Sequence, residues 1–324
     1  MKRGKVIIVG AGMVGTSIAY SILNQSICEE IVIIDINETK AYGEALDMMH
    51  AMEFMNHKTI VRSGDYNDAK DSDVVIITAS VPMDSKLNSR MELLNKNKGI
   101  MKSIVDSLMS NGFSGIMLIV SNPVDIMTYY AWKLSGLPKE KVIGSGTTLD
   151  SARLHYYIAK TVDVSPSSVD AYVIGEHGDS EMVAWSTATI GGKDIFNVVK
   201  DNEARIGKNP YLAFEEEVKK AGWEVFSRKG NTSYGIAASV TGILKAILFD
   251  ESKVYPVSVY LDGEYGVKDC YISVPTIINR FGAKEIVELR LTKDEEEKFI
   301  KSSEILKNKC MEFIEEGAVK KPNF

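Results

Sequence analysis

The chain of 324 residues is poor in cysteine and histidine, and both shortages restrict its chemistry. Its three cysteines, Cys28, Cys270 and Cys310, are an odd number at wide spacings, so neither a disulfide framework nor a zinc site is indicated. We expect no metal site, and reduced thiols favour a cytoplasmic location. Only four histidines are present, so few side chains are available as proton donors near neutral pH.

An excess of positive charge and long apolar runs are also missing. Lys and Arg total 38 against 44 Asp and Glu, and the net charge of −6 lacks the basic footprint that nucleic acid requires. No stretch reaches the roughly 18–20 apolar residues of a membrane span, and glycines interrupt the apolar start in a way that argues against a signal peptide. Charged residues at 25% and hydrophobic residues at 45% are typical of a soluble globular enzyme. At roughly 150 residues per domain, the length suggests two domains.

Short apolar runs alternate with helical patterns in the first half of the chain. Residues 6–9, 31–34, 74–78 and 117–120 are rich in β-branched side chains, and the first three runs precede stretches of helical periodicity. Strands buried on both faces have this character, and their alternation with helices predicts an α/β fold with a Rossmann-type, doubly wound parallel sheet.

The second half has a different pattern. Residues 168–174 and 255–261 alternate like strands, and Asp262-Gly263 before residues 265–274 predicts a hairpin. Thr292 and Glu295 are spaced as a capping box that begins the last helix. We therefore expect the parallel sheet to be followed by an α+β domain.

A glycine-rich motif follows the first predicted strand. Gly10, Gly12 and Gly15 have the spacing in which the glycines allow a tight turn, close approach of a pyrophosphate and close packing of the next helix. That helix offers its N-terminal N–H groups to the phosphates. Asp35 ends the second strand, where a carboxylate accepts hydrogen bonds from ribose hydroxyls and repels a 2′-phosphate. The cofactor predicted is NAD, in an NAD-binding domain over residues 1–144 with a catalytic domain over 145–324; a glycine-rich turn without a ligand is the alternative.

A histidine and an acid–base pair in the second half suggest catalysis. His177 lies in Gly-Glu-His-Gly-Asp just after an apolar strand, although a histidine in such a place is more often an ordinary loop residue. Asp150 and Arg153 share a helix face if their segment is helical. Asp150 could then orient an imidazole, and Arg153 could bind a substrate carboxylate with both prongs of its guanidinium. The alternative is an Asp–Arg pair on the surface of one helix.

Four motifs together resemble the L-lactate/malate dehydrogenase family. They are the glycine motif, Val-Ser-Asn-Pro-Val-Asp at 120–125, Leu-Asp-Ser-Ala-Arg at 149–153 and Gly-Glu-His-Gly-Asp-Ser at 175–180. Their order and spacing follow the family over nearly the whole chain. The sequence of residues 144–150, Gly-Ser-Gly-Thr-Thr-Leu-Asp, is more similar to the lactate branch than to the malate branch.

The resemblance implies a role for each matching residue. His177 is expected to exchange a proton with the C2 oxygen of a 2-oxo acid, Asp150 to orient His177, and Arg153 to hold the carboxylate. Arg90, in the family's mobile loop, is expected to polarise the C2 carbonyl. Asn122 is expected to contact the substrate oxygen near the nicotinamide, with a cis peptide bond to Pro123.

The resemblance extends to further contacts and to assembly. Thr232 matches a substrate-pocket threonine, and the positions expected near the cofactor are Val14, Lys40 and Tyr66. Members of the lactate branch are usually homotetramers, which is the assembly expected here. Hydride transfer to C2 places negative charge on the neighbouring oxygen, which donors around it stabilise.

The expected lid at residues 81–90 departs from the family. Asp84 stands where members that prefer lactate commonly carry Gln and those that prefer malate carry Arg. A carboxylate there repels the second carboxylate of oxaloacetate, so pyruvate and lactate are the predicted substrates. Met83 and Leu87 make the lid more apolar, which leaves a longer or branched 2-oxo acid as the alternative.

A second departure concerns regulation. Many bacterial members of the lactate branch bind fructose 1,6-bisphosphate through an arginine and a histidine, and this chain carries His155 and Asp170 at those places. We expect weak or absent activation. An NAD-dependent glycoside hydrolase is a remote rival, because it needs a metal site and no cysteine lies near Asn122 or His177. A non-catalytic NAD-binding protein is disfavoured by the intact catalytic residues.

Overall fold

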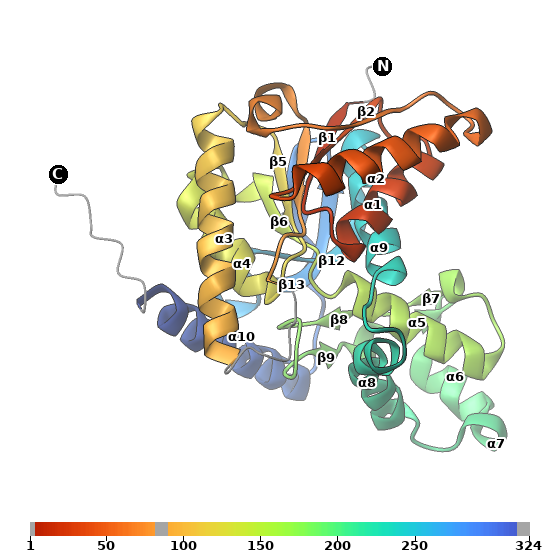
Figure 1. Ribbon diagram of the computed structural model, residues 1–324. Coiled ribbons are helices and arrows are strands. Elements are labelled where there is room, and N and C mark those ends of the chain that lie inside the picture. The colour runs from red at the N-terminus through yellow and green to blue at the C-terminus, as the bar shows by residue number, and fades with distance from the viewer. Residues whose placement is uncertain (1–3, 82–89, 316–324) are drawn as a thin grey trace.

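The protein is built around one nine-stranded sheet, which Figure 1 shows at the centre of the computed structural model. Residues 4–81 and 90–315 are described, with side chains for 4–81 and 95–313. The sheet has the order β14-β13-β12-β6-β5-β4-β1-β2-β3. Its parallel part consists of β1 (Lys5–Val9), β2 (Glu30–Ile34), β3 (Ile60–Ser63), β4 (Val74–Ile77), β5 (Ile116–Ile119) and β6 (Val142–Gly144).

The parallel strands are the apolar runs of the sequence. All four residues of β4 and all four of β5 are buried, because helices cover both faces of the sheet. The predicted doubly wound Rossmann-type sheet is confirmed. The antiparallel strands β12 (Lys253–Asp262), β13 (Lys268–Asn279) and β14 (Gly282–Ile286) continue the same sheet, since Ser258 of β12 pairs with Gly144 of β6. The predicted hairpin is therefore present, and it extends the parallel sheet.

Two groups of helices flank the sheet (Figure 1). One face carries α1 (Met13–Asn24), α2 (Glu38–His50) and α9 (Tyr234–Leu248), and the other carries α3 (Arg90–Ser110), α4 (Val124–Ser135) and α10 (Lys293–Glu315). Right-handed crossovers that run in opposite directions from β1 and β4 place their helices on opposite faces. The strand order reverses between β1 and β4, which is where parallel sheets of this kind bind ligands. Within the described residues, no helix combines the length and the apolar character of a membrane span.

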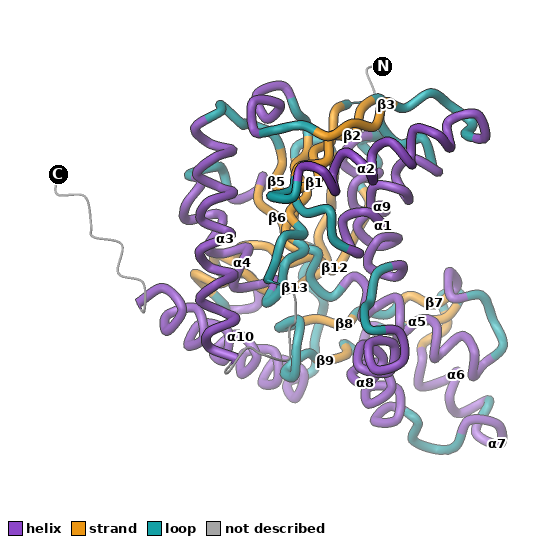
Figure 2. Tube along the Cα trace, in the orientation of Figure 1, coloured by secondary structure: helices purple, strands orange, loops and turns teal. Residues whose placement is uncertain are grey.

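The remaining elements form a smaller unit at the carboxyl ends of the parallel strands. Its helices are α5 (Thr148–Val162), α6 (Ile195–Asp201), α7 (Glu203–Ile206) and α8 (Tyr211–Lys229), and its short strands are β7 (Val169–Asp170), β8 (Val173–Ile174), β9 (Met182–Val183), β10 (Thr189–Ile190) and β11 (Lys193–Asp194). Figure 2 shows loops gathering between the main sheet and this unit. A separate apolar cluster, which includes Leu154 and Phe214, holds the unit together.

The prediction of one strand over residues 168–174 is wrong in detail. The segment divides into β7, which pairs with β10, and β8, which pairs with β9. Each half joins a different small sheet, so the chain bends between Asp170 and Val173. Alternation in the sequence reports which side chains are buried and cannot distinguish one long strand from two short ones.

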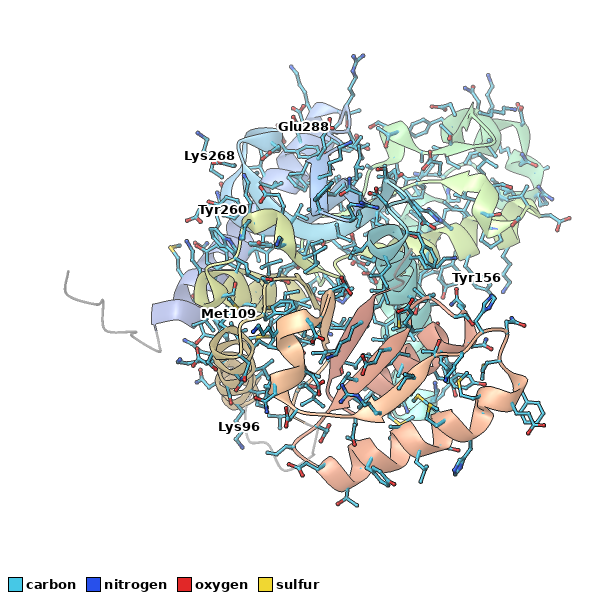
Figure 3. The ribbon with its side chains drawn as sticks, turned by 90° about the horizontal axis from the view of Figure 1, so that it is seen from above. Lys96, Met109, Tyr156, Tyr260, Lys268 and Glu288 are labelled. Atoms are coloured by element: carbon cyan, nitrogen blue, oxygen red, sulfur yellow. The ribbon has the colours of Figure 1, made fainter. Side chains whose placement is uncertain are left out.

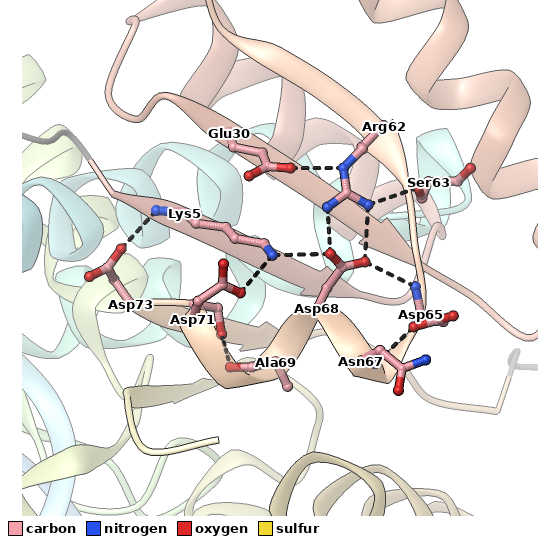
Figure 4. Close-up of polar contacts among 11 residues, drawn as sticks. Lys5, Glu30, Arg62, Ser63, Asp65, Asn67, Asp68, Ala69, Asp71 and Asp73 are labelled. Atoms are coloured by element: carbon pink, nitrogen blue, oxygen red, sulfur yellow. Dashed lines mark hydrogen bonds and ion pairs between the residues drawn. The ribbon is translucent and has the colours of Figure 1, made fainter. Parts of the chain in front are cut away.

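Charged side chains cluster near the edge of the sheet that ends at β3 (Figure 4). The Lys5 Nζ lies 3.0 Å from Asp68 Oδ1 and 2.9 Å from Asp71 Oδ1, and Arg62 pairs with both Glu30 and Asp68. Hydrogen bonds from Arg62 and Lys5 outweigh burial and lower the pKa of Asp68 to about 2. Charges of this kind protect an edge strand from pairing with another chain.

Candidate active site

The glycine motif packs β1 against α1 and leaves one side open. Gly10 has φ +112°, and a Cβ on it would lie 2.7 Å from Thr78 Oγ1. A Cβ on Gly15 would lie 1.9 Å from the Gly10 carbonyl oxygen, so both positions require glycine. A Cβ on Gly12 would meet no atom within 4 Å, which leaves space for a ligand. The α1 N-terminus has no side-chain cap and no acidic residue in its first turn, so its N–H groups suit a diphosphate.

Asp35 is held against this motif at the end of β2. Its Oδ2 accepts a hydrogen bond from Ala11 N at 2.6 Å, and its Oδ1 accepts one from Asn37 N at 2.8 Å. Each oxygen keeps a lone pair for a ribose hydroxyl. Burial, together with the charge of Asp35, raises the pKa of the half-buried Tyr66. The glycine loop, the uncapped helix and this carboxylate fit a bound NAD.

The other two predicted cofactor positions lie on the flanking helices. Val14 is partly buried in the first turn of α1 and packs against the core. Lys40 is exposed near the start of α2, where its backbone N–H donates to Asn37 Oδ1. Ile36, which follows Asp35, is fully exposed at 103% and was not singled out in the sequence. An exposed apolar side chain at this position offers a surface for a flat ring beside the ribose site.

His177 lies in the loop between β8 and β9 and contacts a buried carboxylate. Its Nδ1 is 2.7 Å from Asp150 Oδ2, and Asp150, in the first turn of α5, is only 2% exposed. The His177 side chain is 28% exposed. Burial alone lowers the pKa of the imidazole, but the charge and hydrogen bond of Asp150 outweigh it and raise that pKa to about 9. His177 is therefore a cation at neutral pH.

Arg153 shares the same carboxylate. Its Nη1 donates to Asp150 Oδ1 at 2.8 Å, one turn along α5. The pair lies within one helix, as the alternative interpretation anticipated, but its carboxylate is buried and also contacts His177. Two cationic donors lower the pKa of Asp150 in spite of its burial. Gly222 of α8 faces the guanidinium, and a Cβ there would lie 3.7 Å from Arg153 Nη2.

Each remaining residue predicted for the site either has no described hydrogen bond to the His177–Asp150–Arg153 group or lies outside the described side chains. Asn122 is exposed at the end of β5, and its peptide bond to Pro123 is cis, as expected. Thr232 is half-buried between α8 and α9. Among the described residues, neither side chain has a hydrogen bond to His177, Asp150 or Arg153. Arg90 begins α3, but its side chain and all of Met83 and Asp84 lie outside the described residues.

The structure adds two buried carboxyl groups that the sequence did not reveal as site residues. Asp125, which belongs to the 120–125 motif, accepts hydrogen bonds from His177 N at 2.8 Å and Ser258 Oγ at 2.6 Å. Burial raises its pKa to about 6. Glu181 is 8% exposed, and its carboxylate lies within 4.8 Å of ligand-type atoms of Asp150 and His177.

These three groups include metal-ligand types, but their contacts are those of a proton site. The 2.7 Å separation of His177 Nδ1 and Asp150 Oδ2 is that of a charge-assisted hydrogen bond. Arg153 already occupies the other Asp150 oxygen. A cation placed among them would have to displace both the shared proton and the guanidinium.

Family models match nearly the whole chain. The model described as lactate/malate dehydrogenase, NAD binding domain, matches residues 4–144. The model described as lactate/malate dehydrogenase, alpha/beta C-terminal domain, matches residues 147–316.

Individual relatives and solved structures agree with this match. "L-lactate dehydrogenase 3" of Bacillus thuringiensis and "L-lactate dehydrogenase 2" of Bacillus cereus are each 50% identical, covering 95% of this chain and 98% of the relative. The crystal structure of minor L-lactate dehydrogenase from Enterococcus mundtii in its ligands-bound form is 43% identical with a TM-score of 0.93, covering 99% of this chain and all of that one. A lactate dehydrogenase from a Medee basin deep-sea metagenome library also has a TM-score of 0.93, at 42% identity over 97% of this chain and 99% of that one.

Proposed function

Because the chain belongs to the lactate/malate dehydrogenase family, we propose that it is an L-lactate dehydrogenase, which converts pyruvate, NADH and a proton to L-lactate and NAD⁺ and the reverse. It is an NAD-dependent oxidoreductase. The observation that carries the proposal is the buried Asp150, which pairs with the His177 imidazole through one oxygen and with the Arg153 guanidinium through the other. We assign residues 1–144 to the NAD-binding domain and residues 145–324 to the catalytic domain.

The residues of the site divide the reaction between them. Asp150 holds the proton on His177 Nδ1, so the other ring nitrogen is free to donate its proton to the C2 oxygen. Arg153 is the group for the substrate carboxylate, since a guanidinium binds a carboxylate with two parallel hydrogen bonds. When bound, NADH supplies the hydride for C2. Asn122, Thr232 and Arg90 are assigned to the substrate by family resemblance, as are Met83 and Asp84 in the lid.

The cofactor residues follow from the loop geometry. We assign Gly10, Gly12 and Gly15 to the pyrophosphate turn and Asp35 to the adenosine ribose, supported by the open space at Gly12 and the fixed carboxylate. Flanking contacts are assigned to Val14, Lys40 and Tyr66, with Asn122 beside the nicotinamide.

A longer or branched 2-oxo acid is the second candidate substrate. Gly222 favours it, because this residue places no side chain beside the guanidinium expected to hold the carboxylate. The apolar character of Met83 in the expected lid also favours a longer or branched substrate. Oxaloacetate is disfavoured by the negative charge of Asp84.

A homotetramer in the cytoplasm is the proposed state of the enzyme. Large apolar side chains are exposed on adjoining helices, among them Tyr42 of α2, Tyr156 of α5, Trp223 of α8 and Tyr234 of α9. Tyr156 lies on the side of the molecule away from Tyr260 and Lys268 (Figure 3). Exposed apolar side chains on several helices favour a subunit interface.

NADH oxidation with a panel of 2-oxo acids tests the function. Pyruvate should give the highest kcat/KM, against oxaloacetate, 2-oxobutyrate and 2-oxoisocaproate. His177→Ala should lose most turnover and keep NADH binding, because the histidine supplies the proton and the glycine loop the cofactor site. Near-native turnover by this variant, or faster turnover of oxaloacetate than of pyruvate, would contradict the proposal.

A further inference from the structure

Glu181 is a carboxyl group beside the His177–Asp150 pair with no role so far. It precedes β9, and its backbone N–H donates to the Gly178 carbonyl at 3.2 Å, which turns the chain back toward His177. The side chain is more than nine-tenths buried and lies within 4.8 Å of both partners. Among the residues that the structure describes, no group donates a hydrogen bond to its carboxyl oxygens. A buried carboxylate without donors is costly, so this position calls for an explanation.

We propose that Glu181 is a positioning residue that carries a proton at neutral pH and whose ionisation is coupled to that of His177, so that it raises the upper pH limit of 2-oxo acid reduction. The part that concerns reduction rests on the proposed function. The coupling itself is a property of the ligand-free protein.

The surroundings of Glu181 favour its neutral form. Burial raises the pKa of its carboxyl above the ordinary range, and the negative charge of Asp150 raises it further. The positive charges of His177, Lys219 and Arg153 act in the opposite direction but do not reverse the shift. A neutral Glu181 leaves the cationic side chains in excess around the site, which favours binding of an anionic substrate.

The coupling acts equally in the other direction. An ionised Glu181 stabilises the imidazolium of His177 by the same free energy by which the imidazolium stabilises the carboxylate. The other charged groups around His177 are Asp150 and Arg153 on α5 and Asp125 on α4. Lys219 on α8 donates to the Asp179 carbonyl at 3.4 Å, and Glu176 is paired with Lys309 on α10. Of the carboxyl groups that raise the pKa of His177, only Glu181 has no hydrogen-bond donor among the described residues.

Glu181→Gln tests the proposal, because it keeps the shape of the protonated side chain and removes its ionisation. NMR titration of the ligand-free enzyme can follow His177 directly, since the chain has only four histidines and His177→Ala identifies its signal. We expect the pKa of His177 to fall by about one unit, on the order produced by a single charge 4–5 Å away in a partly screened site. The alkaline limb of kcat/KM for pyruvate should move the same way, with kcat at about pH 6 unchanged because Glu181 is neutral there.

Two further variants control for trivial effects. Glu217→Gln removes a similar charge from an exposed position on α8 and should leave the titration of His177 unchanged. Glu181→Asp restores an ionisable group and should recover part of the shift. An unchanged His177 pKa in Glu181→Gln, or an equal shift in Glu217→Gln, would overturn the proposal. Because the titration needs no turnover, failure of the wild type to reduce pyruvate would refute the proposed function and leave the coupling to be decided by NMR.

Discussion

Replacing Asp150 with asparagine keeps the size of a buried side chain and removes the charge that holds His177 protonated. In the native protein Asp150 Oδ2 lies 2.7 Å from His177 Nδ1 and raises the pKa of the imidazole to about 9. Without this charge, burial opposes protonation and only the weaker effects of Asp125 and Glu181 favour it, so the pKa should fall to about 6.5. A fall of about 2.5 units corresponds to about 3.4 kcal/mol of lost imidazolium stabilisation. That is within the range of about 3–5 kcal/mol for breaking a buried ion pair.

The assay is the pH dependence of kcat/KM for pyruvate, followed by NADH absorbance. The alkaline limit should move from about pH 9 in the wild type to about 6.5 in Asp150→Asn. At about pH 7.5 roughly one His177 in ten would remain protonated. The loss of protonated enzyme alone lowers kcat/KM about tenfold. An asparagine amide can also orient the imidazole in the wrong tautomer, so we expect a total loss of about 10²–10⁴-fold. Activity should recover partly toward acid pH.

The affinity for NADH supplies the control. The glycine loop and Asp35 do not contact Asp150, so the NADH Kd of the variant should be close to that of the wild type. An alkaline limit that stays near the wild-type value, with NADH binding intact, would refute the reasoning. It would show that the proton on His177 does not depend on the charge of Asp150.

Three further predictions test other parts of the structure. Arg153→Leu should raise the KM for pyruvate by about 100-fold or more and leave the NADH Kd unchanged, since it removes the carboxylate-binding charge; an unchanged KM would exclude this role. Fructose 1,6-bisphosphate should leave the pyruvate KM unchanged because Asp170 is an exposed acid on β7, and a large fall in KM would contradict this. The lowered pKa of Asp68 adds stability above about pH 4 that is lost as the pH falls toward 2. Lys5→Met should therefore lower the free energy of unfolding by about 1 kcal/mol at neutral pH and make that free energy less sensitive to acid, as measured by urea unfolding. An equal loss of stability on acidification in both proteins would contradict this.

The fold could be predicted where burial leaves a direct trace in the residue pattern. Strands covered on both faces have to be apolar at every position, which is why β4 and β5 stand out as continuous runs. The pairing of β12 with β6 leaves no such trace, because it depends on which edge of the parallel sheet remains free. Strand partners are also invisible at residues 168–174. The alternating pattern there predicts strand structure, but β7 and β8 pair with different strands.

The candidate site shows a similar division. The sequence singles out His177, Asp150 and Arg153 because each residue type suggests its chemistry and the helical spacing of the last two suggests a shared face; the structure brings the three side chains together. Asp125 and Glu181 were missed, although both lie within six residues of a recognised motif residue. An acidic residue in a sequence is most often solvated, so only the three-dimensional structure shows that these two are buried around one imidazole.

Three carboxyl groups of similar burial around His177 differ in pKa because their hydrogen-bond donors differ. Asp150 and Asp125 are each 2% exposed and Glu181 is 8% exposed, so desolvation raises the pKa of all three. Asp150 receives two cationic donors and its pKa is lowered, whereas Asp125 receives two hydroxyls and a backbone N–H, all neutral, and its pKa rises to about 6. Glu181 receives no donor within the described part of the chain, and its pKa is raised well above the ordinary range. The order follows the charge of the donors, so a chain of negative net charge can keep a cationic proton donor beside a carboxylate that its cationic donors hold ionised.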